Sequence, residues 1–316
     1  AAAAAVSLAR GALVAQVAGS YVEICNANHE LHVAEHSLQL QQRSRTVTQR
    51  LISAGRGTPP DLARATAQVA MLEAALPPLR ARRHAAGYAL AALLGKTPGE
   101  LPAGVDSCAH APALQRPIPI GDGRTLLARR PDVRQAERRL AAATARIGVA
   151  TAELYPDIRL GGSIGATGLL ADIGEPATHA WSIGPLISWT LPSSGAHARV
   201  RATEAGADAA VAQFDHTVLQ ALREVQTTLS RYAQDLDRLR LLEQAQQQAE
   251  LASSQNRRLY QGGRTPYLSS LDAERTLATA DMTLADAQAQ VSKDQIQLFL
   301  ALGGGWEPAT DATAAR

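Results

Sequence analysis

Four side chains with metal-binding chemistry fall on one face of a helical segment near the start of the chain. Cys25, His29, His32 and His36 are spaced by four, three and four residues, which forms a single stripe along an α-helix. Thiolate and imidazole groups bind zinc and copper, and residues 32–36 also fit the HxxEH pattern of inverted zinc proteases. The stripe is therefore a candidate metal or hydrolase site.

An internal repeat argues against that site. The two ends of the chain match without a gap at a constant offset of 208, so that Gly55-Arg56 aligns with Gly263-Arg264. At this offset the four metal-type residues correspond to Ala233, Asp237, Arg240 and Gln244. Because the repeat keeps this face polar without keeping ligands, we interpret it as a polar helix face. We expect no metal, no cofactor and no enzyme activity.

Two other segments have some features of binding motifs. Residues 160–168 are rich in glycine like a phosphate loop, but neither GK[ST] nor GxGxxG occurs there. Residues 129–139 are rich in arginine, but acidic residues are interspersed and stacking aromatics are missing. With a formal net charge of only +2, the sequence predicts a solvated structural helix and no nucleic-acid partner.

The only two cysteines, Cys25 and Cys108, lie 83 positions apart and have no CxxC or zinc-type spacing. We therefore expect neither a disulfide framework nor a metal module. No run of 18 apolar residues without a charge occurs, and we take this to exclude a transmembrane helix. A membrane β-barrel would escape that test, because its strands alternate in polarity.

Composition and apolar spacing predict long, closely packed helices. Hydrophobic residues make up 46% of the 316-residue chain and aromatic residues only 3%, so alanine and leucine supply most of the apolar surface. In both repeats the apolar positions alternate by three and four residues, the period of a coiled-coil seam. Glycine followed by Thr-Pro in residues 52–61 and 260–269 predicts helix reversals. We expect two copies of one helical hairpin, with a continuous helix over 196–261.

Between the two hairpins the pattern changes. A proline-rich connector over 97–124 precedes an amphipathic helix over 129–156, and polarity then alternates in 157–168 and 181–191. This predicts a β-hairpin with a loop of about 12 residues. Its strands are long enough for a tilted bilayer crossing, and Tyr155, Trp181 and Trp189 fall where interfacial aromatics occur. A sandwich hairpin is the alternative, but the sequence offers no second sheet to cover the apolar face.

Four segments carry a resemblance to a known family. They are residues 127–165, which contain RRPDVRQAERRLAAATARIGVATAELYP, and residues 181–192, 271–277 and 301–306. With these segments the chain resembles the outer-membrane efflux proteins, the TolC-like outer-membrane factors of tripartite exporters. Within them it is similar to the lipoprotein subfamily that serves resistance-nodulation-division pumps. The resemblance covers essentially the whole chain.

The resemblance implies a mainly α fold with a small β part. In this fold, three protomers share one transmembrane β-barrel and a long periplasmic α-barrel. It implies a non-enzymatic channel that exports drugs or other small solutes across the outer membrane of a Gram-negative bacterium. The implied partners are two further copies of the chain, a periplasmic adaptor, an inner-membrane pump and outer-membrane lipid. The substrate is not readable from the sequence.

We divide the chain into five parts. Residues 1–96 form the first helical hairpin, with its tip near 55–60, and residues 97–156 form the proline-rich connector and the amphipathic helix. Residues 157–192 form the transmembrane β-hairpin. Residues 193–306 form the second helical hairpin, with its tip near 262–266, and residues 307–316 form a flexible tail.

The resemblance also implies functional residues. Residues 267–275 match the family's periplasmic constriction, where Leu268 would form an apolar collar, Asp272 an acidic ring and Arg275 a tethering cation. The three lie at i, i+4 and i+7 on one helical face, and threefold symmetry would make each a ring; carboxylate rings favour cations. A solvated Asp/Arg face with an i, i+3 pair is the alternative.

The turns at Gly55-Arg56 and Gly263-Arg264 resemble the sites where adaptor hairpins meet the channel tip to tip. Helix capping alone would require the same glycines, so the sequence does not separate the two interpretations.

The chain departs from the family pattern at its start. Family members carry an N-terminal stretch with a signal peptide, a lipidated cysteine and a first β-hairpin, whereas this chain starts inside the helix that follows. One hairpin per protomer gives a trimer fewer than the roughly eight strands of the smallest outer-membrane barrels. We therefore expect either a fragment of a full-length channel or a product that does not insert normally. A soluble coiled-coil scaffold and an inactive remnant are the alternatives.

Overall fold

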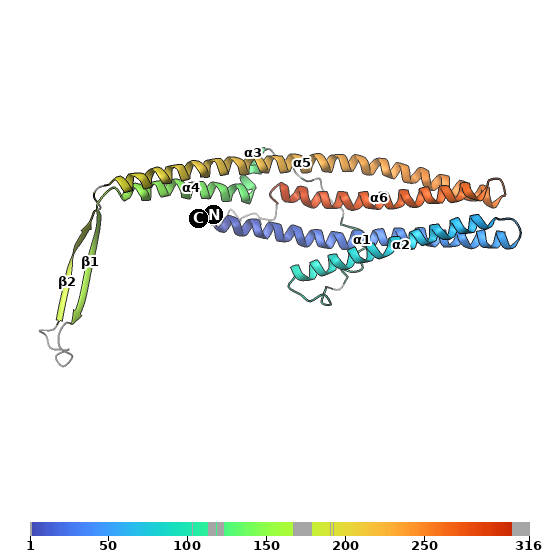
Figure 1. Ribbon diagram of the computed structural model, residues 1–316, viewed down its shortest axis with the longest axis horizontal. Coiled ribbons are helices and arrows are strands. Elements are labelled where there is room, and N and C mark those ends of the chain that lie inside the picture. Colours follow the sequence, from blue (N-terminus) through green and yellow to red (C-terminus); the bar gives the residue numbers. More distant parts are fainter. Residues whose placement is uncertain are drawn as a thin grey trace, which may run out of the picture. The chain divides into compact units, whose positions relative to one another are not determined.

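Long helices dominate the computed structural model, which describes residues 2–102, 104–112, 118, 123–166, 179–189, 191 and 193–304. Within these residues the order of elements is α1 (Ala2–Ser53), α2 (Pro59–Leu93), α3 (Gly123–Arg129), α4 (Pro131–Ala152), β1 (Asp157–Ala166), β2 (His179–Ser188), α5 (Ser194–Gln261) and α6 (Tyr267–Ala301) (Figure 1). The predicted fold class, mainly α with one small sheet, is confirmed. The predicted loop between the strands and the predicted tail lie outside the described residues.

The chain divides into two units, which are described separately. The strand unit consists of Ala1–Ala5 and Asp132–Gln220, and it contains α4, both strands and the first part of α5. The bundle unit consists of Val6–Pro131 and Ala221–Arg316, and it contains most of α1, all of α2, α3 and α6, and the rest of α5.

The two helical hairpins repeat each other in detail. The helices α2 and α6 both have 35 residues, and their bounds differ by the offset found in the sequence. At one tip Arg56 donates its backbone N–H to Leu51 (2.8 Å), and at the other Arg264 donates to Leu259 (2.9 Å). The glycine before each arginine has a positive φ, which the Schellman type of helix end requires. The predicted repeat is thus confirmed.

Apolar contacts in the bundle unit join helices that the repeat places together. Leu31 and Ala34 of α1 pack against Leu76 and Leu79 of α2, with Met282 of α6 at the edge of this cluster. Alanines dominate the buried surface of the middle of α6, where Ala285, Ala287 and Ala289 are among the buried residues. Small side chains allow close approach between helices, as the heptad pattern predicts.

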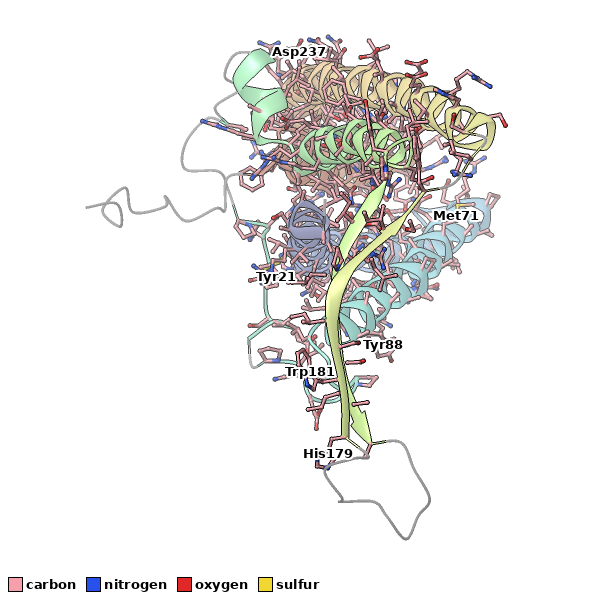
Figure 2. All side chains as sticks on the ribbon, turned by 90° about the vertical axis from the view of Figure 1, so that its left-hand side faces the viewer. Tyr21, Met71, Tyr88, His179, Trp181 and Asp237 are labelled. Carbon is pink, nitrogen blue, oxygen red and sulfur yellow. A yellow bond between two sulfur atoms is a disulfide. The ribbon has the colours of Figure 1, made fainter. Side chains whose placement is uncertain are left out.

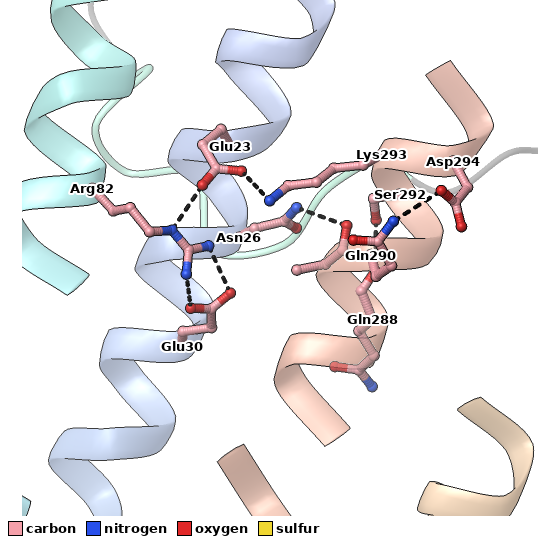
Figure 3. A network of polar contacts seen from close by, with 10 residues as sticks. Glu23, Asn26, Glu30, Arg82, Gln288, Gln290, Ser292, Lys293 and Asp294 are labelled. Carbon is pink, nitrogen blue, oxygen red and sulfur yellow. Dashed lines mark hydrogen bonds and ion pairs between the residues drawn. The ribbon is translucent and has the colours of Figure 1, made fainter. Parts of the chain in front are cut away.

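A charged network links α1, α2 and α6 (Figure 3). Arg82 of α2 donates Nε–H to Glu23 (2.8 Å), and its two Nη atoms bind both carboxylate oxygens of Glu30 (2.8 and 3.0 Å). Lys293 of α6 binds the other oxygen of Glu23 (2.8 Å). Burial by itself raises the pKa of Glu23, but Lys293 and Arg82 outweigh it and hold the pKa below its ordinary value. Burial keeps the pKa of Glu30 above its ordinary value despite Arg82.

A disulfide bond joins Cys25 of α1 to Cys108 in the connector. The prediction that these cysteines form no disulfide was wrong. Asn28 holds the same stretch of connector, since its Nδ2 donates to the carbonyls of Asp106 (3.0 Å) and Cys108 (2.9 Å). The connector therefore does not run free between the hairpins, because its part before residue 112 is fastened to α1.

The predicted extended connector also contains a helix. The sequence reading placed 97–124 in an extended segment and started the next helix at 129, but α3 occupies Gly123–Arg129 and α4 begins at Pro131. Leu126 of α3 is buried with Val225, Leu298 and Leu302. This local apolar contact, which a proline count does not register, explains why the short helix forms.

The strand unit contains an antiparallel two-stranded sheet, with Ile158 opposite Ile187 and Ile164 opposite Trp181. Residues directly opposite each other share a face, so the polarity that alternates along both strands produces one apolar face and one polar face. Leu186 is the exception, because it lies opposite Arg159 on the polar face. The second strand begins two residues earlier than predicted, at His179, and ends at Ser188. Figure 2 shows His179 and Trp181 on this ribbon.

One described helix, α1, is long and apolar enough to satisfy a simple test for membrane crossing, since an 18-residue window in it has at most two charged residues. The exclusion of every transmembrane helix from the lack of an uncharged run was therefore too strict. Signal sequences and core helices satisfy the same test, so we assign no membrane span to α1.

Candidate functional site

The first candidate region is the pair of hairpin tips. Gly55 and Gly263 have φ values of 74° and 70°, and no heavy atom lies within 4 Å of a Cβ placed on either of them. Arg56 and Arg264, which follow them, are exposed. The structure thus places both tip arginines on solvent-facing turns with the same backbone geometry. The space beside each of these glycines is therefore open.

The residues predicted to form a constriction lie at the beginning of α6, next to the second tip. Leu268, Asp272 and Arg275 are all exposed, and Leu268 keeps 51% of its surface in contact with solvent. No ion pair joins Asp272 to Arg275 in the part of the chain that the structure describes. The alternative of a local i, i+3 pair is therefore not observed, and the three side chains are free to face something outside this chain.

Polar groups missed by the sequence reading lie directly behind this exposed face. Glu274 points from α6 toward Arg257 of α5, with 3.6 Å between Oε1 and Nε, and it also interacts with Ser44 of α1. Burial raises the pKa of Glu274 above its ordinary value, although Ser44 and Arg257 act in the opposite direction. Spacing along one helix cannot reveal such a contact, because it depends on how three helices are aligned.

Two tyrosines connect the second tip to the first hairpin. The rings of Tyr260 and Tyr267 lie 5.3 Å apart, on either side of the tip turn, and Tyr267 is buried with Leu271 of α6 and Ala65 of α2. Burial, followed by the neighbouring Tyr267 and Asp61, raises the pKa of Tyr260. The beginning of α6 is thus held from behind while its predicted constriction residues remain exposed.

The second candidate region is the β-hairpin and its aromatics. Tyr155, Trp181 and Trp189 are 67%, 76% and 56% exposed, so all three stand on the surface of this chain. The Trp189 indole donates Nε1–H to the carbonyl of Leu154 (3.2 Å), which fixes the ring at the base of the hairpin. Aromatic rings with one polar edge are typical of a boundary between lipid and water.

The histidine stripe does not come together as a ligand set. Cys25 is bonded to Cys108, and His29 contacts Gln288 (3.1 Å) and lies against His110 with the rings tilted and 4.9 Å between their centroids. His29, His32 and His36 all line a cavity of about 590 Å³ between α1, α5 and α6. Among the described residues, no group of three or more His, Cys, Asp or Glu side chains is placed to hold a metal ion.

Taken together, these features define a class of protein. Two matched coiled-coil hairpins with exposed tips, joined to an apolar β-ribbon with aromatics at its base, are the parts of a wall that spans both an aqueous space and a membrane. The described tips and ribbon contribute surfaces to that wall. They contain no nucleophile paired with a base.

Comparison with known proteins identifies the family. The model of the outer membrane efflux protein family matches residues 1–96 and 123–304, and the chain belongs to this family. It is 29% identical over 315 residues to nodulation protein T of Rhizobium leguminosarum bv. trifolii, covering 98% of this chain and 67% of that protein. It is 31% identical to outer membrane protein OprJ of Pseudomonas aeruginosa, covering 95% of this chain and 63% of that protein.

A solved structure agrees with this assignment. The outer-membrane channel OprN superposes with a TM-score of 0.90 at 38% identity, covering 97% of this chain and 69% of that one. The resemblance stated from the sequence and the outer-membrane location that it implies are therefore confirmed. The chain spans about two thirds of the length of these relatives.

Proposed function

We propose that this chain is the efflux-channel part of a subunit that assembles as a trimer in the outer membrane and conducts small solutes outward from the periplasm. The channel does no covalent chemistry. Its helical hairpins enclose the periplasmic duct, and its β-hairpin contributes strands to the shared barrel. Family membership over nearly all of the described elements supports a channel over a soluble scaffold.

The observation that carries this proposal is the exposed apolar face of the β-hairpin. Six apolar residues on that face are exposed by 66% to 91%: Ile158, Leu160, Ile164, Trp181, Ile183 and Ile187. In the described part of the chain the sheet has two strands and no second sheet packs on it. An apolar face this large is unfavourable in water, so lipid is the environment that it fits.

The beginning of α6 is proposed as the closable end of the duct. In a trimer, Leu268, Asp272 and Arg275 would each form a ring, and the Asp272 ring would attract cations into the narrow section. Their exposure in a single chain supports this role, because a lumen-facing residue has no partner within its own protomer. Tyr267 and Glu274 would hold the α6 end against the first hairpin.

The proposed partners follow from the tips. A periplasmic adaptor would dock on the turns at Gly55-Arg56 and Gly263-Arg264, and an inner-membrane pump would supply the driving force. The repeated backbone geometry of the two turns supports this role, since similar turns offer two equivalent sites per protomer.

Single-channel recording tests the proposal. The full protein, purified in detergent and inserted into planar bilayers, is expected to conduct with a preference for cations. Asp272→Asn is expected to reduce that preference, and Asp237→Asn, an exposed carboxylate on α5 outside the tips, is the matched control. Absence of channels, or equal effects of the two substitutions, would refute the proposed duct or its proposed gate, respectively.

A further inference from the structure

A cavity lies at the base of the β-hairpin, entirely within the strand unit. It has a volume of about 590 Å³ and is bordered by the end of α4, the beginning of β1, the end of β2 and the first turns of α5. This volume is within the range of pockets that hold small organic ligands, about 300 to 1,000 Å³. We call it the basal pocket and define it by Glu153, Tyr155, Asp157, Ile158, Trp189 and Arg199.

One side of the basal pocket carries charges of both signs. Arg199 of α5 and Glu153, just beyond α4, form an ion pair with 2.6 Å between Nε and Oε2. The side chains remain 59% and 47% exposed, so solvent weakens this ion pair and it can open at little cost. Asp157 adds a second carboxylate, which is paired with Arg159 (2.7 Å) outside the cavity lining.

The other side of the basal pocket is apolar. Ile158 is 68% exposed, and Trp189 presents its ring at a position fixed by the hydrogen bond from Nε1 to Leu154. Ile158 also begins the apolar face of the hairpin, so the apolar wall of the pocket continues directly onto the surface proposed to face lipid. A ligand that fits both walls has a dipolar, charged end and a hydrocarbon end.

We propose that the basal pocket binds the headgroup of a zwitterionic phospholipid that bears a primary ammonium group. This rests on the proposed outer-membrane function, since it assigns a lipid to the boundary that the hairpin creates. The phosphate pairs with Arg199, the ammonium group donates hydrogen bonds to Glu153 and Asp157, and the acyl chains leave along Ile158 and Trp189.

Charge balance selects this headgroup over others. An anionic lipid that lacks an amine could bind Arg199 only by displacing Glu153, and the Glu153 carboxylate would then have no cation to neutralise it. Free phosphoethanolamine would satisfy the charged wall but leave the apolar wall in contact with water. Only a molecule with phosphate, ammonium and hydrocarbon together matches all three parts of the pocket.

Native mass spectrometry of the full protein in non-ionic detergent tests the assignment. The probes are dioleoyl phosphatidylethanolamine, dioleoyl phosphatidylglycerol and free phosphoethanolamine. We expect phosphatidylethanolamine to saturate at one molecule per protomer, and the other two probes to bind about tenfold more weakly because each loses one charge-assisted or apolar set of contacts. Equal binding of phosphatidylglycerol, or phosphoethanolamine binding as tightly as the lipid, would overturn the proposal.

Two substitutions separate recognition from a structural effect. Arg199→Gln is expected to weaken phosphatidylethanolamine binding about tenfold, whereas Arg201→Gln, an exposed arginine on the same helix outside the pocket lining, should leave it unchanged. Glu153→Gln is expected to reduce the difference in affinity between the two lipids, because phosphatidylglycerol then binds more tightly relative to phosphatidylethanolamine. A misfolded pocket would instead weaken the binding of both lipids. Equal losses in Arg199→Gln and Arg201→Gln would overturn the site.

The measurement is independent of membrane insertion, because the protein is already in detergent. Selective lipid binding by a protein that does not fractionate with the outer membrane would contradict the proposed function alone. A protein that forms trimeric channels but binds the three probes alike would contradict the basal pocket alone.

Discussion

Asp294 provides a sharp test of how the second hairpin is packed. This carboxyl group on α6 is completely buried and faces Asp235 of α5. Gln290 donates a hydrogen bond to its Oδ1 (2.9 Å), but Oδ2 has no donor among the described residues while both carboxyls are ionised. One proton between the two aspartates would satisfy both. Burial, and then the nearby Asp235, raise the pKa of Asp294 from 3.8 to about 6.

The sign of the pH dependence follows from this rise. Between pH 4 and pH 6 the folded protein holds a proton on Asp294 that the unfolded chain has released, so stability falls as the pH rises through this range and is level above it. Above about pH 6 the ionised Asp294 costs on the order of 1 to 3 kcal/mol. Asp294→Asn removes the charge, keeps an acceptor for Gln290 and supplies a donor to Asp235.

Thermal unfolding of the full protein, followed by circular dichroism at pH 7.5 and pH 5.0, measures this effect. Asp294→Asn is expected to raise the melting temperature at pH 7.5 by about 2 to 4 °C and by about half as much at pH 5.0, where the folded aspartate is protonated but the unfolded one is still ionised. Asp237→Asn is the control, because this exposed carboxylate on α5 is paired with Arg240. A lower melting temperature for Asp294→Asn at pH 7.5, or the same difference at both pH values, would refute the reasoning.

Three further outcomes are expected. Arg82→Gln leaves the buried Glu30 without its ion-pair partner and should lower the free energy of unfolding by about 2 to 4 kcal/mol, measured with denaturant. Arg80→Gln removes an ion pair in which both side chains are exposed and should lower it by less than about 1 kcal/mol. Similar losses for the two variants would contradict the network. Gly263→Ala should destabilise by about 1 kcal/mol because of its positive φ, whereas Gly206→Ala, inside a helix with free space around it, should stabilise slightly by the same assay. Reduction of the Cys25 disulfide, checked by thiol alkylation and mass spectrometry, should lower stability by about 2 to 4 kcal/mol, and an unchanged unfolding midpoint would show that the bond does not constrain the connector.

The periodic spacing of apolar residues was sufficient to predict much of the fold. The three-four spacing of apolar residues predicted both hairpins because a coiled-coil seam has to repeat along each helix. Alternating polarity predicted the faces of the β-ribbon, since side chains in a strand alternate strictly. The exact match in length between α2 and α6 follows from the repeat, because each copy has Gly-Arg in the turn before the helix and Leu-Gly directly after it.

Contacts between elements were not readable in the same way. The disulfide was missed because an 83-residue separation says nothing about distance until the hairpin is folded. The lengths of the helices contain the missing signal: the chain runs from Cys25 to the first tip and returns along 35 residues of α2, which brings the connector back near its starting point. A reading that traced the path of the chain could have paired the two cysteines.

The candidate sites show the same difference between residues grouped by their spacing in the sequence and residues brought together by helix packing. The constriction residues share a helical face, so i, i+4, i+7 spacing was enough to group Leu268, Asp272 and Arg275, and their roles remain proposals. Glu274 and Asp294 were not singled out, because their environments depend on the alignment of α6 against α1 and α5. Helix alignment is set by packing over many turns, and a single sequence does not specify it residue by residue.

The most direct test of the central claim is the mass and location of the full protein after expression behind an export signal. Membranes are separated, the outer-membrane fraction is extracted with mild detergent, and the mass of the extracted protein is measured by light scattering. A trimer in the outer-membrane fraction is the expected result, and it should be lost in Ile164→Lys on the apolar strand face but kept in Ser163→Lys on the polar face. A soluble monomer, or equal tolerance of both lysines, would contradict a membrane-inserted channel.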